Sequence, residues 1–322
     1  MVETRQKWTD LIPDTGLRIS EVFDQGDALY TPGIFSLVKK ATGTGAQENY
    51  TGKTSFGKMK KFDDGDNIPG TERFKTYTTK TVFVNYGEAV DVTGNQIEDR
   101  DFDAELDEMK DLSRSANYSV DESSVQLFNG GFATTTTVNG YDITWYGDGV
   151  PLFSTIHPTV VPGASTQSNA SSTGISLTHD NLETARLALM LQQQDNGLAL
   201  GMAGKLTLVV PLNGEKNAKE TVMSDLTPQN ANNAINTFKG SMDVVSTIFL
   251  DTVNGGLNSQ WFLVNEAMSK LNFVSRQDKR LNSQVSIRNK VVTYTVDARW
   301  SVVAKDWRGV WGSKGDLAAY SS

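Results

Sequence analysis

The sequence predicts an α+β fold in which an arm, a long polar loop and one long helix precede a compact mixed region. The compact region begins at residues 177–223, which predict a helix, a buried strand and a second helix. Residues 97–128 keep apolar side chains close to the helical period, which predicts one long helix. Residues 41–70 are rich in glycine and charge and cannot form a core of their own.

The first helix of the 177–223 segment has a start signal and an apolar face. Thr178 or Asp180 can cap its N-terminus, and Glu183 is placed to complete a capping box with Asp180. The apolar side chains that share one face are Leu182, Ala185, Leu189 and Met190. Asn196-Gly197 favours a left-handed or turn conformation, so we expect the helix to end there.

A buried strand follows this helix. Residues 206–210, with the sequence LTLVV, are almost entirely apolar or β-branched, which predicts a strand covered on both faces. Pro211 cannot continue the strand, and a second helix is expected to run to Met223. Further predicted elements are a polar helix over residues 227–238 and strands over residues 242–250, 261–263 and 291–303.

The 97–128 segment predicts a helix longer than most helices of globular proteins. At 1.5 Å per residue it would span roughly 45 Å. Acidic residues crowd its first turns, where the helix dipole favours anions, and Gly130-Gly131 provides a stop signal. The segment lacks the heptads of a coiled coil, so we expect a single strut. Beyond it, Asn139-Gly140 is a strong hairpin signal.

The N-terminal third is the least regular part of the chain. Residues 1–40 carry scattered apolar side chains among turn residues, which is typical of an arm that runs over another surface. The charged residues of the polar loop that follows are Lys53, Lys58, Lys60, Lys61, Asp63, Asp64 and Asp66. A structureless functional loop and a projecting two-stranded hairpin fit this loop equally well. Residues 72–92 alternate threonine, aromatic and valine side chains, which predicts a strand leaving the loop.

The composition excludes several classes of protein. The chain has 322 residues and a formal net charge of −8, which argues against a protein that grips nucleic acid by neutralising phosphates. It has no cysteine, which excludes disulfides and thiolate metal sites. No apolar run approaches the roughly 20 residues of a membrane helix, and the N-terminus lacks the pattern of a signal peptide. We therefore expect synthesis in the cytoplasm.

Two sequence motifs suggest chemistry, and both are incomplete. Residues 51–54 (TGKT) match the end of a phosphate-binding loop, but Gln47 stands where that motif needs glycine. Residues 63–66 (DDGD) resemble the start of a calcium loop, but Phe74 stands where a closing glutamate is needed. We interpret the two segments as a solvated basic loop and as turn residues.

The histidines and tryptophans do not predict an active site either. His157 and His179 are the only histidines, and the glycine-framed serine of a hydrolase, G-x-S-x-G, does not occur. Near the C-terminus, valines are interleaved with Trp300, Trp307, Trp311, Arg299 and Arg308. This pattern favours sheet packing with cation–π contacts. We therefore predict no catalytic residue, no cofactor and no metal site.

Three segments carry a resemblance that covers essentially the whole chain. The first is L-T-x-x-N-L at residues 177–182, followed by Gly204–Pro211. The others are PLFSTIHP at residues 151–158 and the tail at residues 294–312. With the order of arm, loop, long helix and compact region, they resemble the major capsid proteins of tailed bacteriophages. Those proteins share the Hong Kong 97 capsid fold, and the Mu-like major head subunit is the member that this chain resembles most.

The resemblance implies a division of the chain into four parts. Residues 1–40 would be the N-terminal arm, and residues 41–80 the extended loop that reaches over a neighbouring subunit. Residues 81–175 would form the peripheral domain, with residues 97–128 as its spine helix. Residues 176–322 would form the axial domain, with strands that return to the peripheral domain.

The resemblance also implies a function in assembly. The subunit would form pentamers and hexamers of an icosahedral shell that encloses double-stranded DNA, and it would be located in the virion. Its partners would be a separate scaffolding protein, a portal and DNA contacted non-specifically, with a decoration protein as an optional addition, and no membrane would be involved. The candidate inter-subunit contact residues are Lys53, Phe56, Lys58, Lys60, Lys61 and Trp8. Some members of the family cross-link this loop through a lysine, but no motif here predicts that cross-link.

Three alternatives remain open from the sequence. An encapsulin-type compartment would have the same fold and would hold enzyme cargo instead of DNA. A tail-tube or sheath subunit would lack this order of loop and long helix. An α/β enzyme would need a glycine-rich or acidic signature after Val210, and residues 211–214 (PLNG) offer none.

Overall fold

The computed structural model divides into two compact units. It describes residues 21–24, 26, 33–93, 102–200, 204–227, 234–286, 288 and 290–319. The first unit comprises Met1–Pro32, Phe83–Glu122 and Ser275–Trp300, and the second comprises Gly33–Val82, Ser123–Val274 and Ser301–Ser322. Helix α3 (Phe102–Asn129), strand β10 (Leu271–Ser286) and strand β11 (Val291–Ala304) each contribute residues to both units.

The first unit packs the start of α3 on a sheet. Strand β4 (Val84–Thr93) runs antiparallel to β11, with Val92 opposite Val292, and β10 pairs with the other edge of β11. The buried side chains between helix and strands are Phe23, Val92, Met109, Leu112, Val292, Tyr294 and Val296. The predicted long helix is confirmed from Phe102 to Asn129, and its predicted start at residues 97–101 lies outside the described residues.

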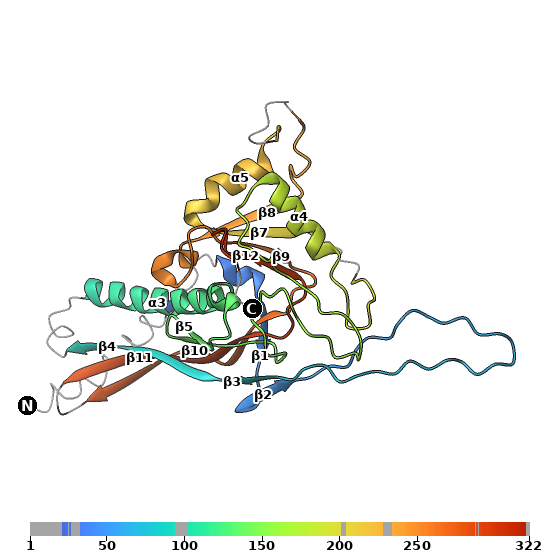
Figure 1. Cartoon of the computed structure of the whole chain (residues 1–322). Coiled ribbons are helices and arrows are strands. Elements are labelled where there is room, and N and C mark those ends of the chain that lie inside the picture. The colour runs from blue at the N-terminus through green and yellow to red at the C-terminus, as the bar shows by residue number, and fades with distance from the viewer. Residues whose placement is uncertain are drawn as a thin grey trace, which may run out of the picture. The chain divides into compact units, whose positions relative to one another are not determined.

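A four-stranded sheet forms the centre of the second unit (Figure 1). Its strands, in spatial order, are β12 (Val310–Ser313), β9 (Trp261–Asn265), β7 (Leu206–Pro211) and β8 (Met242–Thr247). Every residue of β7 is buried, which confirms the predicted doubly covered strand, although the strand includes Pro211 as its last residue. Strand β7 runs parallel to β8 and antiparallel to β9.

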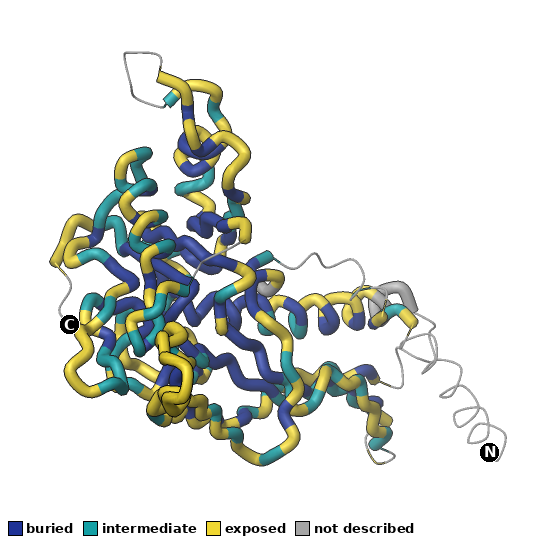
Figure 2. Tube along the Cα trace, turned by 90° about the vertical axis from the view of Figure 1, so that its right-hand side faces the viewer, coloured by how far each residue is buried: buried dark blue, intermediate teal, exposed yellow. Residues whose placement is uncertain are grey.

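Helices α4 (His179–Met190) and α5 (Glu215–Met223) pack against this sheet. The shared core of helices and strands consists of Leu182, Ala185, Leu189, Leu206, Leu208, Val210, Ala218, Val222, Phe238, Met242, Trp261, Leu263 and Trp311. Figure 2 shows the buried residues of this unit gathered on its inner strands and the exposed residues on its outer helices and loops. The predicted order of helix, buried strand and helix is therefore confirmed, including the apolar face of the first helix.

The ends of α4 differ in part from the sequence prediction. Thr178 is the N-cap and accepts a hydrogen bond from the Asn181 backbone N–H at 3.3 Å. Because Thr178 and not Asp180 is the N-cap, Glu183 lies beyond the capping-box position, and its carboxylate pairs with Arg186 at 2.8 Å. The helix ends at Met190, before the predicted stop at Asn196-Gly197. The reason is tertiary: the Gln192 side chain bonds the backbone of β12 and its preceding turn, which draws the chain away from the helix axis.

The N-cap of α4 can be tested directly. We expect Thr178→Ala to lower the free energy of unfolding by about 1 kcal/mol, because the Asn181 N–H loses its acceptor at the helix start. Urea unfolding followed by circular dichroism measures the change. Thr184→Ala is the matched control: Thr184 bonds a carbonyl within the same helix, and we expect a change within about 0.5 kcal/mol. Equal losses in the two variants would contradict the assigned cap.

Other predicted elements are confirmed or corrected. Asn139-Gly140 forms the predicted tight turn, with φ of 47° and 81°, between β5 (Thr137–Val138) and β6 (Tyr141–Thr144). The polar helix predicted over 227–238 is wrong at the residues of this range that the structure describes, 227 and 234–238. Ile235 forms an antiparallel bridge with Leu226 there. The strand predicted over 242–250 ends earlier, at Thr247, in a 3-10 turn. Strand β10 was not predicted.

The remaining elements are short. They are the strands β1 (Lys39–Thr42), β2 (Gln47–Tyr50) and β3 (Thr79–Val82) and the 3-10 helices at Ile34–Leu37, Gly130–Phe132, Leu212–Gly214, Ile248–Leu250 and Thr252–Asn254. The strand predicted over 72–92 begins only at Thr79 and is divided into β3 and β4 at Phe83. Among the described residues, no helix is long and apolar enough to cross a bilayer.

Candidate functional site: the extended loop and the pocket at its base

The second unit carries a long two-stranded projection (Figure 1). Strands β2 and β3 pair antiparallel, with Tyr50 opposite Thr79. The pairing continues outward through a bridge between Lys53 and Lys75 and a 2.8 Å hydrogen bond from the Thr54 N–H to the Phe74 carbonyl. Of the two forms that the sequence left open, the structure therefore shows the projecting hairpin. Within the predicted loop of residues 41–80, residues 51–78 form this projection, and from here on the name extended loop refers to residues 51–78.

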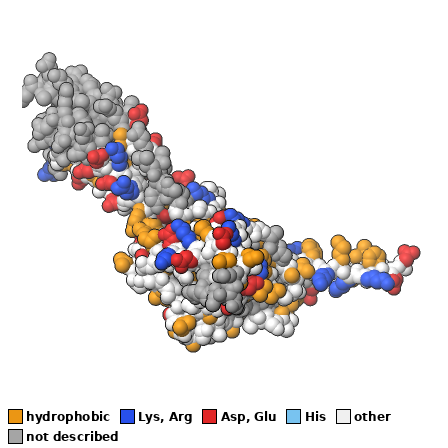
Figure 3. Space-filling view, turned by 90° about the horizontal axis from the view of Figure 1, so that it is seen from above, with side chains coloured by type: hydrophobic (Ala, Val, Ile, Leu, Met, Phe, Trp, Pro, Cys, Tyr) orange, Lys and Arg blue, Asp and Glu red, His pale blue; other side chains and the backbone are white. Residues whose placement is uncertain are grey.

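The extended loop carries large apolar side chains that remain exposed to solvent in the subunit. Their exposed fractions are 64% for Phe56, 102% for Met59, 50% for Phe62 and 78% for Ile68. Figure 3 shows hydrophobic side chains along one edge of the loop, with basic side chains along the other edge and acidic side chains at the tip. All residues from 58 to 73 are exposed. A row of this kind is typical of a surface that is covered by another molecule.

The candidate contact residues lie at different heights on this loop. Lys53 lies at its base, and the Arg73 guanidinium lies 4.5 Å from the ring centre of Phe56. Lys58, Lys60 and Lys61 are exposed on the outward arm. Lys61 approaches Asp63 only at 3.8 Å, with both side chains in solvent. Trp8 lies outside the described residues.

A polar pocket of about 420 Å³ lies at the base of the extended loop. Both arms of the loop line it, and the opposite wall comes from the turn around Asp195 and from the segment between β11 and β12. Its charged lining residues are Lys53, Lys270, Lys305, Arg308, Asp195 and Asp306. We call this cavity the base pocket.

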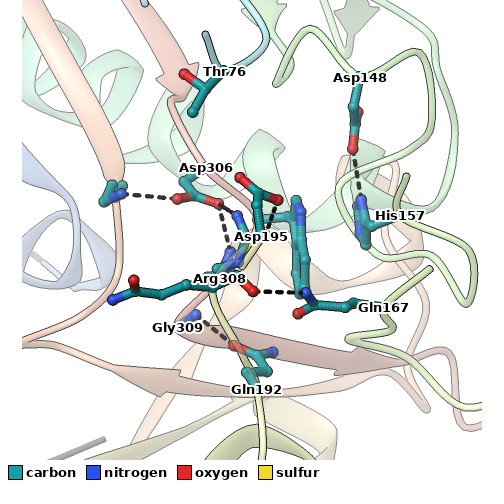
Figure 4. Close-up of polar contacts among 12 residues, drawn as sticks. Thr76, Asp148, His157, Gln167, Gln192, Asp195, Asp306, Arg308 and Gly309 are labelled. Carbon is teal, nitrogen blue, oxygen red and sulfur yellow. Dashed lines mark hydrogen bonds and ion pairs between the residues drawn. The ribbon is translucent and has the colours of Figure 1, made fainter. Parts of the chain in front are cut away.

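Arg308 organises the inner wall of the base pocket (Figure 4). Its guanidinium contacts Asp195 Oδ1 at 2.7 Å and Asp306 Oδ1 at 3.2 Å, and its Nε donates to the Gln193 carbonyl at 2.8 Å. Lys270 Nζ contacts the other oxygen of Asp306 at 2.8 Å. Two buried carboxylates are therefore balanced by two cations, and the inner wall is internally neutral.

The pKa values of these groups follow from burial and charge. Burial opposes ionisation of Asp306, but the charges of Arg308 and Lys270 outweigh it and hold the pKa of its carboxyl below the ordinary value. Burial likewise opposes the charge of Arg308, but Asp306 and Asp195 outweigh it and raise the pKa of its guanidinium. The pKa of Lys305 is lowered, chiefly because its ammonium is partly desolvated over the Tyr50 ring, at 3.8 Å from the ring centre.

Next to this wall lies a buried histidine network (Figure 4). His157 Nδ1 lies 2.8 Å from Asp148 Oδ2, and its Nε2 lies 3.1 Å from Asn169 Oδ1. Asn169 donates its amide to two backbone carbonyls, so its oxygen faces the histidine as an acceptor. The His157 ring also stacks on Trp307, with ring centres 4.2 Å apart. His157 is fully buried and holds chain segments together, and His179 packs against Phe238 at the start of α4.

Sequence reasoning identified only part of this site. The predicted cation–π contact between Arg308 and Trp307 is present at 4.5 Å. The ion pair of Arg308 with Asp195 joins residues 113 positions apart, and no local pattern predicts it. The base pocket was missed for the same reason, because its lysines come from both ends of the chain.

Comparisons with known proteins identify the family. A family profile described as "Phage capsid protein" matches residues 75–313. No curated protein matches the chain. The capsid of bacteriophage JBD30 is similar, with a TM-score of 0.55 and 18% identity, over 69% of this chain and 92% of that chain.

Two further solved structures share the fold. The mature capsid of bacteriophage PhiM1 has a TM-score of 0.54 and 10% identity, over 88% of this chain and 87% of that chain. The structure of Mycobacterium phage Patience has a TM-score of 0.53 and 13% identity, over 97% of this chain and 89% of that chain. Because the family profile spans well over half of the sequence, the chain belongs to the phage capsid proteins and is a subunit of a phage shell with a Hong Kong 97-like fold.

Proposed function

We propose that this chain is a Mu-like major head protein whose pentamers and hexamers close an icosahedral shell around double-stranded DNA. The observation that supports the proposal best is the extended loop. It projects from its unit, exposes four large apolar side chains, and is exposed at every residue from 58 to 73. Such a segment gains a packing partner only from a neighbouring molecule.

The proposal assigns a role to each part of the chain. Residues 1–40 form an arm, and residues 41–80 form the loop that lies over a neighbour. Residues 81–175, with the spine helix, form the peripheral domain, and residues 176–322 form the axial domain around the ring axes. The candidate contact residues Lys53, Phe56, Lys58, Lys60, Lys61 and Trp8 belong to the surfaces that meet other copies.

Weak individual contacts suffice for such a shell. Full burial of one large apolar side chain contributes about 1.5–3 kcal/mol, and ordering the loop opposes part of this gain. Each subunit of a shell meets several neighbours, so modest contacts act together. The extended loop of every copy would therefore contribute a small favourable free energy, and these contributions act together over the many contacts of the shell.

The remaining partners follow from the same proposal. A separate scaffolding protein guides assembly, a portal occupies one vertex, and a decoration protein is an optional addition. The net charge of −8 disfavours tight binding of phosphates, which suits DNA that is packed and later released. The subunit is made in the host cytoplasm, becomes part of the virion, and acts without catalysis or a cofactor.

Electron microscopy of the purified chain, alone and with its scaffolding protein, tests the proposal. We expect rings of five and six subunits and closed particles of uniform size. Particles recovered from phage-producing cells should contain DNA, measured by the ratio of absorbance at 260 and 280 nm. Particles filled with a protein cargo would favour the encapsulin-type alternative. A monomer at every concentration, with and without scaffold, would exclude a shell protein.

A further inference from the structure

We propose that the base pocket of one copy binds the acidic tip of the extended loop of a second copy. The acidic tip is the turn that carries Asp63, Asp64 and Asp66. The ligand class is thus a peptide turn with several carboxylates. This inference rests on the proposed shell assembly and specifies one of its contacts.

The cationic side chains that line the base pocket outnumber its carboxylates. Its two carboxylates, Asp195 and Asp306, are bonded by Arg308 and Lys270. Among the described residues, no carboxylate forms an ion pair with Lys53 or Lys305, which line the same cavity. Glu48 is close enough to favour the charge of Lys305 and offsets part of it, so the excess positive charge of the cavity rests chiefly on Lys53. The cavity therefore attracts an anion.

A second group in the base pocket needs a hydrogen-bond donor. Gln194 lines the cavity, and its buried Oε1 has no partner among the described residues. A peptide turn offers both kinds of group, because its carboxylates can pair with Lys53 and Lys305 and its backbone N–H can donate to Gln194 once that side chain turns toward the cavity. The phosphates of DNA offer only acceptors. The pocket therefore matches an acidic peptide better than nucleic acid.

The tip of the extended loop has the complementary form. The Asp66 N–H donates to the Asp63 carbonyl at 3.0 Å, and Gly65 takes the left-handed conformation that closes the turn, with a φ of 90°. The three aspartates are exposed. Within the described ranges, the one ion pair to these aspartates is that of Lys61 with Asp63, at 3.8 Å in open solvent, which is a weak interaction.

Geometry directs the tip to another copy. About ten residues separate Lys53 from Asp63 along an extended arm, which corresponds to roughly 33 Å. The ribbon therefore holds its own tip well away from its own base pocket. A contact between tip and pocket joins two unlike surfaces, so it is heterologous and repeats head to tail from one copy to the next. It generates a ring when the rotation between successive copies adds up to a full turn.

A charge exchange tests this contact in the full-length chain. The pocket variant is Lys53→Glu with Lys305→Glu, and the tip variant is Asp63→Lys with Asp64→Lys and Asp66→Lys. We expect each variant to raise the subunit concentration needed for assembly about tenfold or more, because like charges then face each other. The variant with both sets should recover most of this loss. Analytical ultracentrifugation with electron microscopy measures the assembled fraction.

Controls separate this contact from a folding defect and from the proposed function. Lys58→Glu with Lys60→Glu makes the same change of charge outside the pocket, and the tip variant should not recover any loss of assembly that this change causes. A milder pocket variant, Lys53→Gln with Lys305→Gln, should keep the wild-type melting curve and still weaken assembly. The contact would be overturned if the pocket variant and the tip variant both fold but the variant that combines them does not recover assembly. A pocket variant that assembles normally but loses DNA would also overturn the contact, because it would show that the pocket binds the phosphates of DNA. Failure of the wild-type chain to form shells would instead reject the proposed function itself.

Discussion

Replacement of Arg308 with methionine is expected to lower the free energy of unfolding of the subunit by about 3–5 kcal/mol. The guanidinium is buried and holds Asp195 at 2.7 Å and Asp306 at 3.2 Å. Without it, Asp195 loses its cation and Asp306 keeps only Lys270. The methionine side chain fills most of the space, so the loss reports the unpaired charge. Urea unfolding at pH 7, followed by tryptophan fluorescence, measures it.

Two further variants show whether unpaired charge causes this loss. The triple variant Asp195→Asn, Asp306→Asn, Arg308→Met leaves no buried carboxylate, and we expect it to be more stable than Arg308→Met alone. Arg186→Met is the matched control, because Arg186 also contacts a carboxylate at 2.8 Å but is half-exposed on α4. That control should lose no more than about 1 kcal/mol. Similar losses for Arg186→Met and Arg308→Met would reject the explanation.

The same ion cluster should give a pH dependence of known sign. The pKa of Asp306 in the folded chain is below its ordinary value, so the ionised carboxylate stabilises the fold above the unfolded pKa, near 4. This contribution is lost as the pH falls through the folded pKa. The difference between the wild type and Arg308→Met should therefore shrink in acid, since protonation removes the charge that the variant leaves unpaired.

The elements that the sequence predicted well are those whose form is decided locally. Strand β7 is an uninterrupted apolar run, and α4 repeats its apolar side chains on one face, so each carries its own evidence. Strand β10 does not. Only its first four residues are buried, and the charged remainder alternates between partly and fully exposed positions. That remainder is a strand because β11 supplies its hydrogen-bond partners, which no pattern within β10 shows.

The candidate site likewise has one part that the sequence predicts, the extended loop, and one part that it does not, the base pocket. Glycines and clustered charge predicted the extended loop, because a segment without apolar periodicity cannot join a core. The base pocket depends on closure of the chain, which brings Lys53 beside Lys305 across about 250 positions. The acidic residues of the tip are evident in the sequence, but the role proposed for them depends on the structure, which shows a turn that presents them together at the end of the loop.

Shortening the extended loop is expected to abolish shells while leaving the subunit folded. Thr54 and Phe74 face each other across the ribbon, so Asn-Gly in place of residues 56–72 can close it as a tight hairpin. This design retains the bond from Asn196 to the Ser55 carbonyl and the bond from Arg73 to the Thr54 carbonyl. Nearly all the removed residues are exposed, so the free energy of unfolding should change by only about 0.5 kcal/mol. Negative-stain microscopy and urea unfolding give the two readouts.

Two full-length variants then show which edge of the loop drives assembly. Serine at Phe56, Met59, Phe62 and Ile68 removes the apolar edge and keeps the lysines. Glutamine at Lys58, Lys60 and Lys61 removes the basic edge and keeps the apolar one. If burial of apolar surface drives the contact, the serine variant loses shells at every salt concentration and the glutamine variant retains them. The opposite result would show that the loop acts by charge. If the chain with the shortened loop unfolds, the loop stabilises its own subunit. An exposed loop can be removed without loss of stability only where its contacts lie in other copies.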